Sequence, residues 1–159
     1  DFVSRIKAIL AATGVHPAML TLEVTEGLAL EDLPMTIAKM TELKALGFHL
    51  SIDDFGTGYS SLAYLKRLPF DELKIDRSFV QDAPTDPNDA ALVETILAVA
   101  RHLHLAVVAE GVETIEQIDF LKTHGCRLFQ GYFYGKPQPA TEFIAAVLSL
   151  GPGDPAVPL

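Results

Sequence analysis

The sequence is poor in cysteine, in basic residues and in long apolar runs, and each shortage argues against a class of protein. Cys126 is the single cysteine, so a disulfide framework is excluded and a reducing cytoplasm is the expected compartment. The chain has 12 Lys and Arg against 21 Asp and Glu, a formal charge of −9, and no basic run. This balance argues against nonspecific binding to DNA or to an anionic membrane surface.

No apolar stretch approaches the length of a membrane span, and we see no signal peptide in the residues given. The 159 residues, 49% of them hydrophobic, suffice for one domain with a sizeable core. The chain opens without Met on a segment that is typical of a helix, so we expect it to be a piece of a longer protein. Residues 151–159 are rich in Pro and Gly, which predicts a flexible tail.

Short β-rich apolar runs alternate with helical patterns along the chain. We predict strands at residues 19–25, 48–53, 72–75, 106–109 and 127–130. We predict helices from residue 2 to the stop at Gly14, and at 34–46, 59–67, 89–103, 113–124 and 141–148. This alternation is typical of an α/β fold with a parallel sheet. Two architectures remain open: a small open sheet, or the back part of a (β/α) barrel, which when complete needs eight strands and roughly 250 residues.

Polar side chains occur near the ends of the predicted strands. A parallel sheet that is covered on both faces should be apolar throughout, and these residues break that rule at the end where α/β proteins form their sites. Because strand side chains alternate between faces, we expect the set to converge on one pocket. The alternative is that strand ends are simply solvated. The set is Glu23, Asp53, Asp54, Lys74, Glu110 and Gln130.

Residues 51–62 carry two adjacent carboxylates, Asp53 and Asp54, followed at once by a Gly-x-Gly turn at Gly56 and Gly58. Adjacent acids repel each other unless a cation lies beside them, and oxygen-ligated Mg²⁺ or Mn²⁺ is the usual partner. Read alone, the stretch is equally consistent with a solvated turn.

The other residue types favour hard divalent cations, because no His or Cys cluster has the spacing of a metal site. Paired ions activate a water and neutralise a phosphoryl oxygen. Asp53 and Asp54 are placed to serve such a pair, Glu110 to bind an ion or accept a proton, and Lys74 to hold the water or balance a phosphate. The set suits phosphodiester hydrolysis, and it equally suits enolate chemistry with Mg²⁺.

Five motifs in a fixed order carry a resemblance. They are Leu22-Glu-Val-Thr-Glu26, Ile52-Asp-Asp-Phe-Gly-Thr-Gly-Tyr-Ser-Ser-Leu62, Leu73-Lys-Ile-Asp76, Ala109-Glu-Gly-Val-Glu-Thr114 and Gln130-Gly-Tyr132. Together they resemble the EAL-domain cyclic di-GMP phosphodiesterases of bacteria, from the first residues to about Leu150. The resemblance implies a modified (β/α)8 TIM-like barrel, of which residues 1–150 would be an incomplete C-terminal portion with about five parallel strands.

The resemblance also implies a reaction and a set of roles. Members cut one phosphodiester of cyclic di-GMP to give linear pGpG, with Mg²⁺ or Mn²⁺ and two ions. By resemblance, the metal ligands are Glu23, Asp53 and Asp54, the catalytic residues are Lys74 and Glu110, the residues that orient water or substrate are Gln130 and Glu113, and the loop-stabilising residue is Glu26. A homodimer through the helix that follows the loop of residues 53–62 is implied too, as is an upstream cyclase-like or sensory domain.

One departure matters. The Glu-Ala-Leu segment that names the family, and an asparagine ligand on the next strand, have no counterpart in this sequence. We therefore expect the isolated chain to be weak or inactive as an enzyme, and the complete domain to be active. The alternative is a non-catalytic module that binds cyclic di-GMP or regulates a neighbouring domain.

Overall fold

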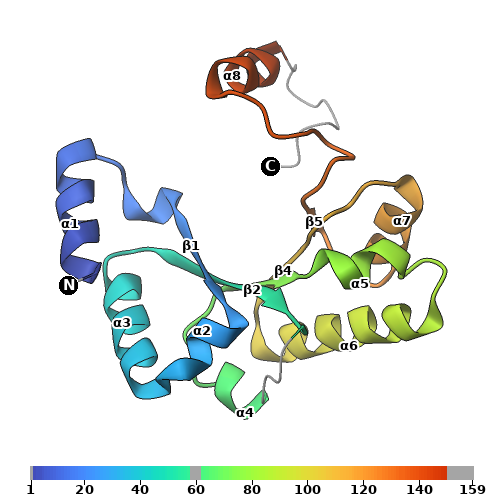
Figure 1. Cartoon of the computed structure of the whole chain (residues 1–159), viewed down its shortest axis with the longest axis horizontal. Helices are drawn as coiled ribbons and strands as arrows, with labels where there is room; N and C mark the ends of the chain where they lie inside the picture. Colours follow the sequence, from blue (N-terminus) through green and yellow to red (C-terminus); the bar gives the residue numbers. More distant parts are fainter. Residues whose placement is uncertain (1, 58–61, 150–159) are drawn as a thin grey trace.

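Five strands form one parallel sheet, in chain order, in the computed structural model of this chain (Figure 1), which describes residues 2–57 and 62–149. The strands are β1 (Thr21–Thr25), β2 (His49–Phe55), β3 (Glu72–Ile75), β4 (Ala106–Ala109) and β5 (Leu128–Phe129). All four pairings between neighbours are parallel. The prediction of an α/β fold with about five parallel strands is confirmed.

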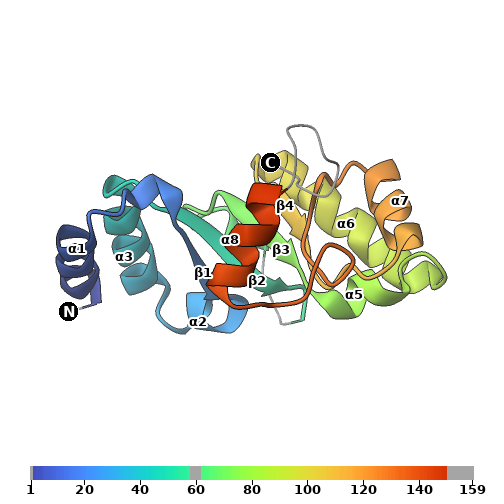
Figure 2. The ribbon, with the colours of Figure 1, turned by 90° about the horizontal axis from the view of Figure 1, so that it is seen from above.

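Helices connect the strands and cover the sheet. They are α1 (Phe2–Thr13), α2 (Glu26–Glu31), α3 (Leu33–Ala45), α4 (Leu62–Leu65), α5 (Arg77–Asp82), α6 (Pro87–Leu103), α7 (Ile115–Thr123) and α8 (Ala140–Ser149), with a 3₁₀ turn at Pro17–Met19. In Figure 1, α3 and α6 lie below the strands and α8 stands apart above them. Figure 2 shows α1 and α3 at one end of the molecule and α5, α6 and α7 at the other. No helix in the described part of the chain is both long and apolar enough to cross a membrane.

Capping residues fix where the main helices begin. The Asp32 carboxylate accepts a hydrogen bond from the Met35 amide at 3.1 Å, and the Asp86 carboxylate accepts one from the Asn88 amide at 2.7 Å. Thr114 forms a reciprocal capping box with Gln117 at the start of α7. Asp86 thus fixes the start of α6.

Two helices were not predicted, and several element ends differ from the expectation. The helices α2 and α5 have only six residues each, too few to show a helical period. The strand β1 begins at Thr21 because Pro17 places the preceding residues in a 3₁₀ turn, and β5 ends before Gln130. The predicted tail, residues 151–159, and residues 58–61, where we predicted the start of a helix, lie outside the described residues.

The core lies between the sheet and the helices. Leu50, Leu73, Ile75 and Ala109 have no exposed surface, and they alternate along their strands with more polar neighbours. Helix α3 packs on β2, and α6 packs on β3 and β4. The sheet therefore has one face that helices cover, and the polar residues of its strands project from the other face.

Gly131 lies against the backbone of the segment that follows β4. The backbone carbonyl of its neighbour Gln130 accepts a hydrogen bond from the Val112 amide at 3.1 Å. The Phe133 amide donates a hydrogen bond to the Val112 carbonyl at 3.0 Å. A Cβ atom at position 131 would stand 2.1 Å from that carbonyl oxygen. Only glycine fits such an approach without moving the backbone.

We expect Gly131→Ala to lower the free energy of unfolding by about 1–3 kcal/mol, the usual cost of overpacking. Urea denaturation followed by circular dichroism measures the loss. Gly135→Ala is the matched control, because a Cβ there would meet nothing within 4 Å. Equal stability of the two variants would contradict the close approach.

Asp71 joins the beginnings of three strands. Its carboxylate accepts hydrogen bonds from Lys44 Nζ at 2.6 and 2.7 Å and from the Leu50 amide at 2.9 Å. Its own amide donates to the Leu50 carbonyl, and its carbonyl accepts from the Ala106 amide. Burial works to raise the pKa of Asp71, but the bonds from Lys44 and Leu50 outweigh it and hold the pKa below its ordinary value.

A lowered pKa in the folded state means that the charged form of Asp71 stabilises the fold. This contribution is complete above the unfolded pKa of about 3.9 and is lost as pH falls through the lower folded value. We expect Asp71→Asn to cost about 1–3 kcal/mol at pH 7, and the difference from wild type to shrink as pH falls below about 4. Denaturation midpoints from pH 7 to 3 test this, with Asp119→Asn on the exposed face of α7 as control. A difference that does not change with pH would refute the ionic role.

Candidate functional site

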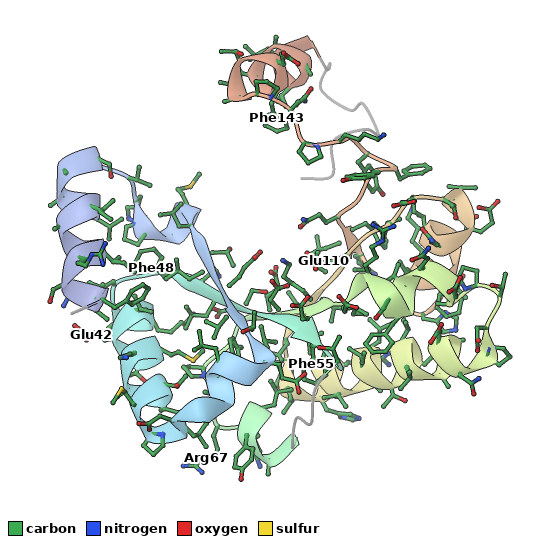
Figure 3. All side chains as sticks on the ribbon, in the orientation of Figure 1. Glu42, Phe48, Phe55, Arg67, Glu110 and Phe143 are labelled. Carbon is green, nitrogen blue, oxygen red and sulfur yellow. The ribbon has the colours of Figure 1, made fainter. Side chains whose placement is uncertain are left out.

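A lysine surrounded by carboxylates lies where the strands end. Lys74 Nζ is 2.8 Å from Glu23 Oε1, 3.1 Å from Asp53 Oδ1 and 2.7 Å from Glu110 Oε1. Each partner comes from a different part of the sheet: Glu23 from β1, Asp53 from β2 and Glu110 from the residue after β4. Figure 3 labels Glu110 near the centre of the molecule. The expected convergence of these side chains is therefore present.

The strand register explains the convergence. Thr25 of β1 pairs with Asp53 of β2, so Glu23 and Asp53 share a face of the sheet at neighbouring positions. Lys74 of β3 pairs with Val108 of β4, so Glu110 lies two residues further on and on that same face.

Burial and charge act on this cluster in opposite directions. The Lys74 side chain is 6% exposed, and such burial disfavours its charge, but its hydrogen bonds to Glu110, Glu23 and Asp53 raise its pKa above the ordinary value. The ammonium therefore stays charged at neutral pH. Burial raises the pKa of Glu110; Lys74 opposes that shift, and the charges of Asp53 and Glu23 add to it.

Asp54 joins the cluster through an unusual backbone conformation. Its φ of +54° is left-handed, and the pairing of β2 with β3 shifts register between Ile52 and Phe55. Side chains of successive strand residues normally point to opposite faces, and this irregularity lets two consecutive carboxylates serve one site. Burial, with Asp53 and Asp76 nearby, raises the pKa of Asp54.

Asp53, Asp54 and Glu110 form a donor set that fits a divalent cation. Each offers one carboxylate oxygen, and these oxygens all lie within 4.8 Å of one another. Clustered carboxylate oxygens are the ligands that Mg²⁺ and Mn²⁺ prefer. Glu23, also predicted as a ligand, joins the same cluster through its contact of 2.8 Å with Lys74 Nζ.

Asp76 belongs to the same group and was missing from the predicted set. Its carboxylate lies near that of Asp54, and it accepts hydrogen bonds from the Ser78 amide at 2.9 Å and from the Ser78 hydroxyl. Burial works to raise the pKa of Asp76, but the hydrogen bonds from Ser78 lower it. The sequence held the signal, because Asp76 shares its strand face with Lys74.

Glu26 connects α2 to the turn after Asp54. It is 4% exposed, and its Oε2 atom accepts a hydrogen bond from the Gly56 amide at 3.1 Å. Its Oε1 atom has no partner among the described residues. A contact of this kind suits the predicted loop-stabilising role, which stays a prediction because residues 58–61 lie outside the description.

The remaining two predicted residues line a cavity beside Glu110. This cavity has a volume of about 230 Å³, and it was not foreseen that Arg77 and Tyr132 would share it with Glu113 and Gln130. Arg77 forms an ion pair with Glu113, in which Arg77 Nη2 lies 3.1 Å from Glu113 Oε1. The residues that line this cavity are Arg77, Glu110, Gly111, Glu113, Gln130, Gly131 and Tyr132.

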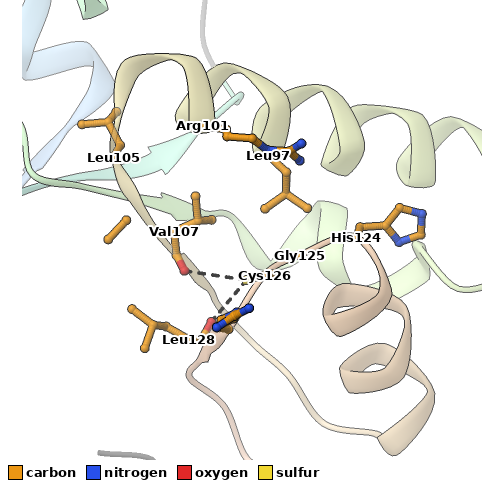
Figure 4. Close-up of a pocket in the computed structure, with 10 residues that line it drawn as sticks. Leu97, Arg101, Leu105, Val107, His124, Gly125, Cys126 and Leu128 are labelled. Atoms are coloured by element: carbon orange, nitrogen blue, oxygen red, sulfur yellow. Dashed lines mark hydrogen bonds between the residues drawn. The ribbon is translucent and has the colours of Figure 1, made fainter.

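A second cavity, of about 300 Å³, lies at the opposite ends of β4 and β5 (Figure 4). It contains none of the predicted site residues. The Cys126 thiol lines it and donates to the Leu128 carbonyl at 3.4 Å, and burial raises its pKa. This thiol is buried in the hydrophobic core.

Comparison with known proteins identifies the family. The model of the EAL domain matches residues 1–137. Among curated proteins, the chain is 48% identical to the cyclic di-GMP phosphodiesterase NbdA of Pseudomonas aeruginosa, over 92% of this chain and 19% of that protein. It is also 48% identical to the bifunctional diguanylate cyclase/cyclic di-GMP phosphodiesterase MucR of the same organism, over 91% of this chain and 21% of MucR. The chain thus spans about a fifth of the length of these relatives.

Solved structures agree with this assignment. The phosphodiesterase PaMucR in complex with cyclic di-GMP matches with a TM-score of 0.85 and 48% identity, over 89% of this chain and 57% of that one. The EAL domain of DcpA from Mycobacterium smegmatis matches with a TM-score of 0.86 and 39% identity, over 92% of this chain and 66% of that one. These neighbours confirm the predicted TIM-like barrel class. The chain belongs to the EAL domain family.

Proposed function

We propose that the protein containing this chain is a metal-dependent phosphodiesterase that hydrolyses cyclic di-GMP to linear pGpG. The observation that carries the proposal is the cluster of Glu23, Asp53 and Glu110 around Lys74, with Asp54 beside it. NbdA and MucR are named cyclic di-GMP phosphodiesterases, and BlrP1 of Klebsiella pneumoniae, 36% identical over 85% of this chain with a TM-score of 0.79, was solved with manganese and cyclic di-GMP. Residue types alone left enolate chemistry open, and family membership favours the phosphodiester.

The carboxylates provide the ion-binding part of the site. Glu23, Asp53 and Asp54 would hold two Mg²⁺ or Mn²⁺ ions, with Glu110 close enough to share in ligation. Such ions supply Lewis acidity and a water of lowered pKa when they are bound. Without bound cations, the carboxylates would repel the negatively charged phosphodiester. Ion binding is therefore also a condition for substrate binding.

Lys74 and Glu110 would act on the reacting groups. The Lys74 ammonium, held by its three carboxylates, would offer positive charge to the attacked phosphate. Glu110 Oε1 lies 2.7 Å from Lys74 Nζ and is positioned to accept a proton from the attacking water. Gln130 would orient water or substrate from the rim of the neighbouring cavity.

We extend the proposal to the assembly and its setting. The whole protein would act in the cytoplasm as a homodimer, through the helix that follows the loop of residues 53–62, of which α4 is the described part. MucR is named as both a cyclase and a phosphodiesterase, which supports the expectation of a further cyclase-like or sensory domain.

Asp53→Asn in the full-length protein tests the metal site. Because the change removes a charge that would neutralise a bound ion, we expect turnover of cyclic di-GMP to fall about 100-fold or more, with the fold retained. Chromatographic quantitation of pGpG at saturating Mg²⁺ measures this. Asp119→Asn on α7 is the matched control, and wild-type rates in Asp53→Asn would count against the metal assignment.

A second experiment compares chains of different length. The match to the solved PaMucR chain covers only 57% of that chain, so we expect the 159-residue chain alone to show weak or no turnover. The same assay is run on a chain extended upstream to the complete domain, which we expect to be active with Mg²⁺ or Mn²⁺. Full turnover by the short chain would refute this expectation. Binding of cyclic di-GMP without turnover by the extended chain would favour the non-catalytic module instead.

A further inference from the structure

The cavity of about 300 Å³ lies at the end of the sheet opposite to the carboxylate cluster (Figure 4). It lies between the last turn of α6, the residues after α7 and the starts of β4 and β5. Sites for small organic molecules begin at about this volume, and they are mainly apolar with a few polar groups. The apolar side chains of this wall are those of Leu97, Leu105, Val107 and Leu128.

The charge of this cavity is opposite to that of the chain. The sequence has 21 Asp and Glu against 12 Lys and Arg. Among the described residues, however, the lining includes two arginines, Arg101 and Arg127, and no carboxylate. Both arginines are exposed, and neither forms an ion pair with an acidic residue in residues 2–57 or 62–149. The cavity therefore presents two positive charges without counter-charge beside an apolar wall.

Helix stabilisation explains only one of these arginines. Arg101 lies in the last turn of α6, where a positive charge interacts favourably with the helix dipole. Arg127 lies outside the helices, directly before β5. Two guanidinium groups on one small cavity also repel each other, so their placement is unfavourable until an anion joins them.

His124 also lines the cavity, but both of its ring nitrogens are already engaged. Its Nδ1 atom lies 2.7 Å from the Phe120 carbonyl oxygen, and its Nε2 atom lies 3.0 Å from Glu94 Oε1. The ring is thus a fixed part of the wall. The N–H donors that remain for a ligand belong to the two arginines, each of which carries five.

A phosphate monoester matches this arrangement. The planar fork of a guanidinium fits two oxygens of a phosphate. Such a phosphate carries a charge of about −1.5 to −2 at neutral pH, which would balance the charges of Arg101 and Arg127. A carboxylate would balance only one of them. The organic part of the ester would lie against the apolar wall, where its burial adds to the affinity.

We propose that this cavity is a second ligand site, in which Arg101 and Arg127 bind a phosphate monoester that has a small apolar body. The site lies where β4 and β5 begin, and the carboxylate cluster lies where the strands end, so the two sites do not overlap. The inference is independent of the proposed function, because it requires neither the metal ions nor cyclic di-GMP.

The test uses phenyl phosphate as the probe and the full-length protein in EDTA, so that no ion at the carboxylate cluster holds the phosphate. Titration calorimetry gives the Kd. We expect Arg101→Ala and Arg127→Ala each to raise the Kd for phenyl phosphate roughly 10-fold or more, because each removes a charge-assisted donor. Arg101→Lys and Arg127→Lys, which keep the charge without the fork, should recover only part of the affinity.

Controls separate this site from general attraction of anions. Arg5→Ala removes an exposed arginine of α1, at the other end of the molecule (Figure 2), and should bind phenyl phosphate like wild type. Inorganic phosphate, benzyl alcohol and benzoate should each bind roughly 10-fold more weakly than phenyl phosphate, because each lacks the apolar body, the anion or the second charge.

Several results would overturn the proposal. One is a wild-type Kd for phenyl phosphate in Arg101→Ala or in Arg127→Ala. Another is the absence of phenyl phosphate binding by the full-length protein, which would mean that the cavity is filled or closed there. Equal or tighter binding of inorganic phosphate, benzyl alcohol or benzoate would also overturn it, because the ligand would then not be a phosphate monoester with an apolar body.

Discussion

The ion pairs of Lys74 are the interaction on which the rest of this structure depends. Three carboxylates approach one buried ammonium within 2.7–3.1 Å, and each arrives from a different segment of the sheet. Without that positive charge, their mutual repulsion would favour protonation or separation of the strand ends. Removing one partner from a buried ionic cluster is costly for the same reason. Lys74 thus ties β1, β2, β3 and the end of β4 together at the mouth where the acids gather.

The acidic mouth also depends on local breaks in regular structure. The left-handed backbone at Asp54 carries the second carboxylate into the cluster, and an Asp tolerates this conformation better than most residues. The Gly56 amide that follows is held by the buried Glu26 carboxylate. Irregular backbone at a functional site persists when the surroundings over-determine it, and here α2 supplies that constraint.

The sequence predicted those residues of the site whose side chains follow the two-residue alternation of a strand. Glu23, Asp53 and Lys74 could be placed on one face because strand side chains alternate, and parallel strands bring their carboxyl ends to one edge. Asp54 broke that period, and it was predicted only because it adjoins Asp53 in a recognisable motif. Arg77 could not be found this way, because its side chain packs where Gly111 has no Cβ atom. These two residues are far apart in the sequence and come together only in the folded chain. The short helices α2 and α5 were missed because six residues show no period.

The two halves of the mouth differ in what their charges can do. The carboxylate cluster around Asp53 has the oxygen donors that hard divalent cations prefer. The pair of Arg77 and Glu113 is neutral overall, so it adds little attraction for phosphate, and its donor and acceptor act through direction. Glu110 borders both halves, since it contacts Lys74 and lines the cavity. A single residue after β4 therefore joins the carboxylate cluster to the neighbouring cavity.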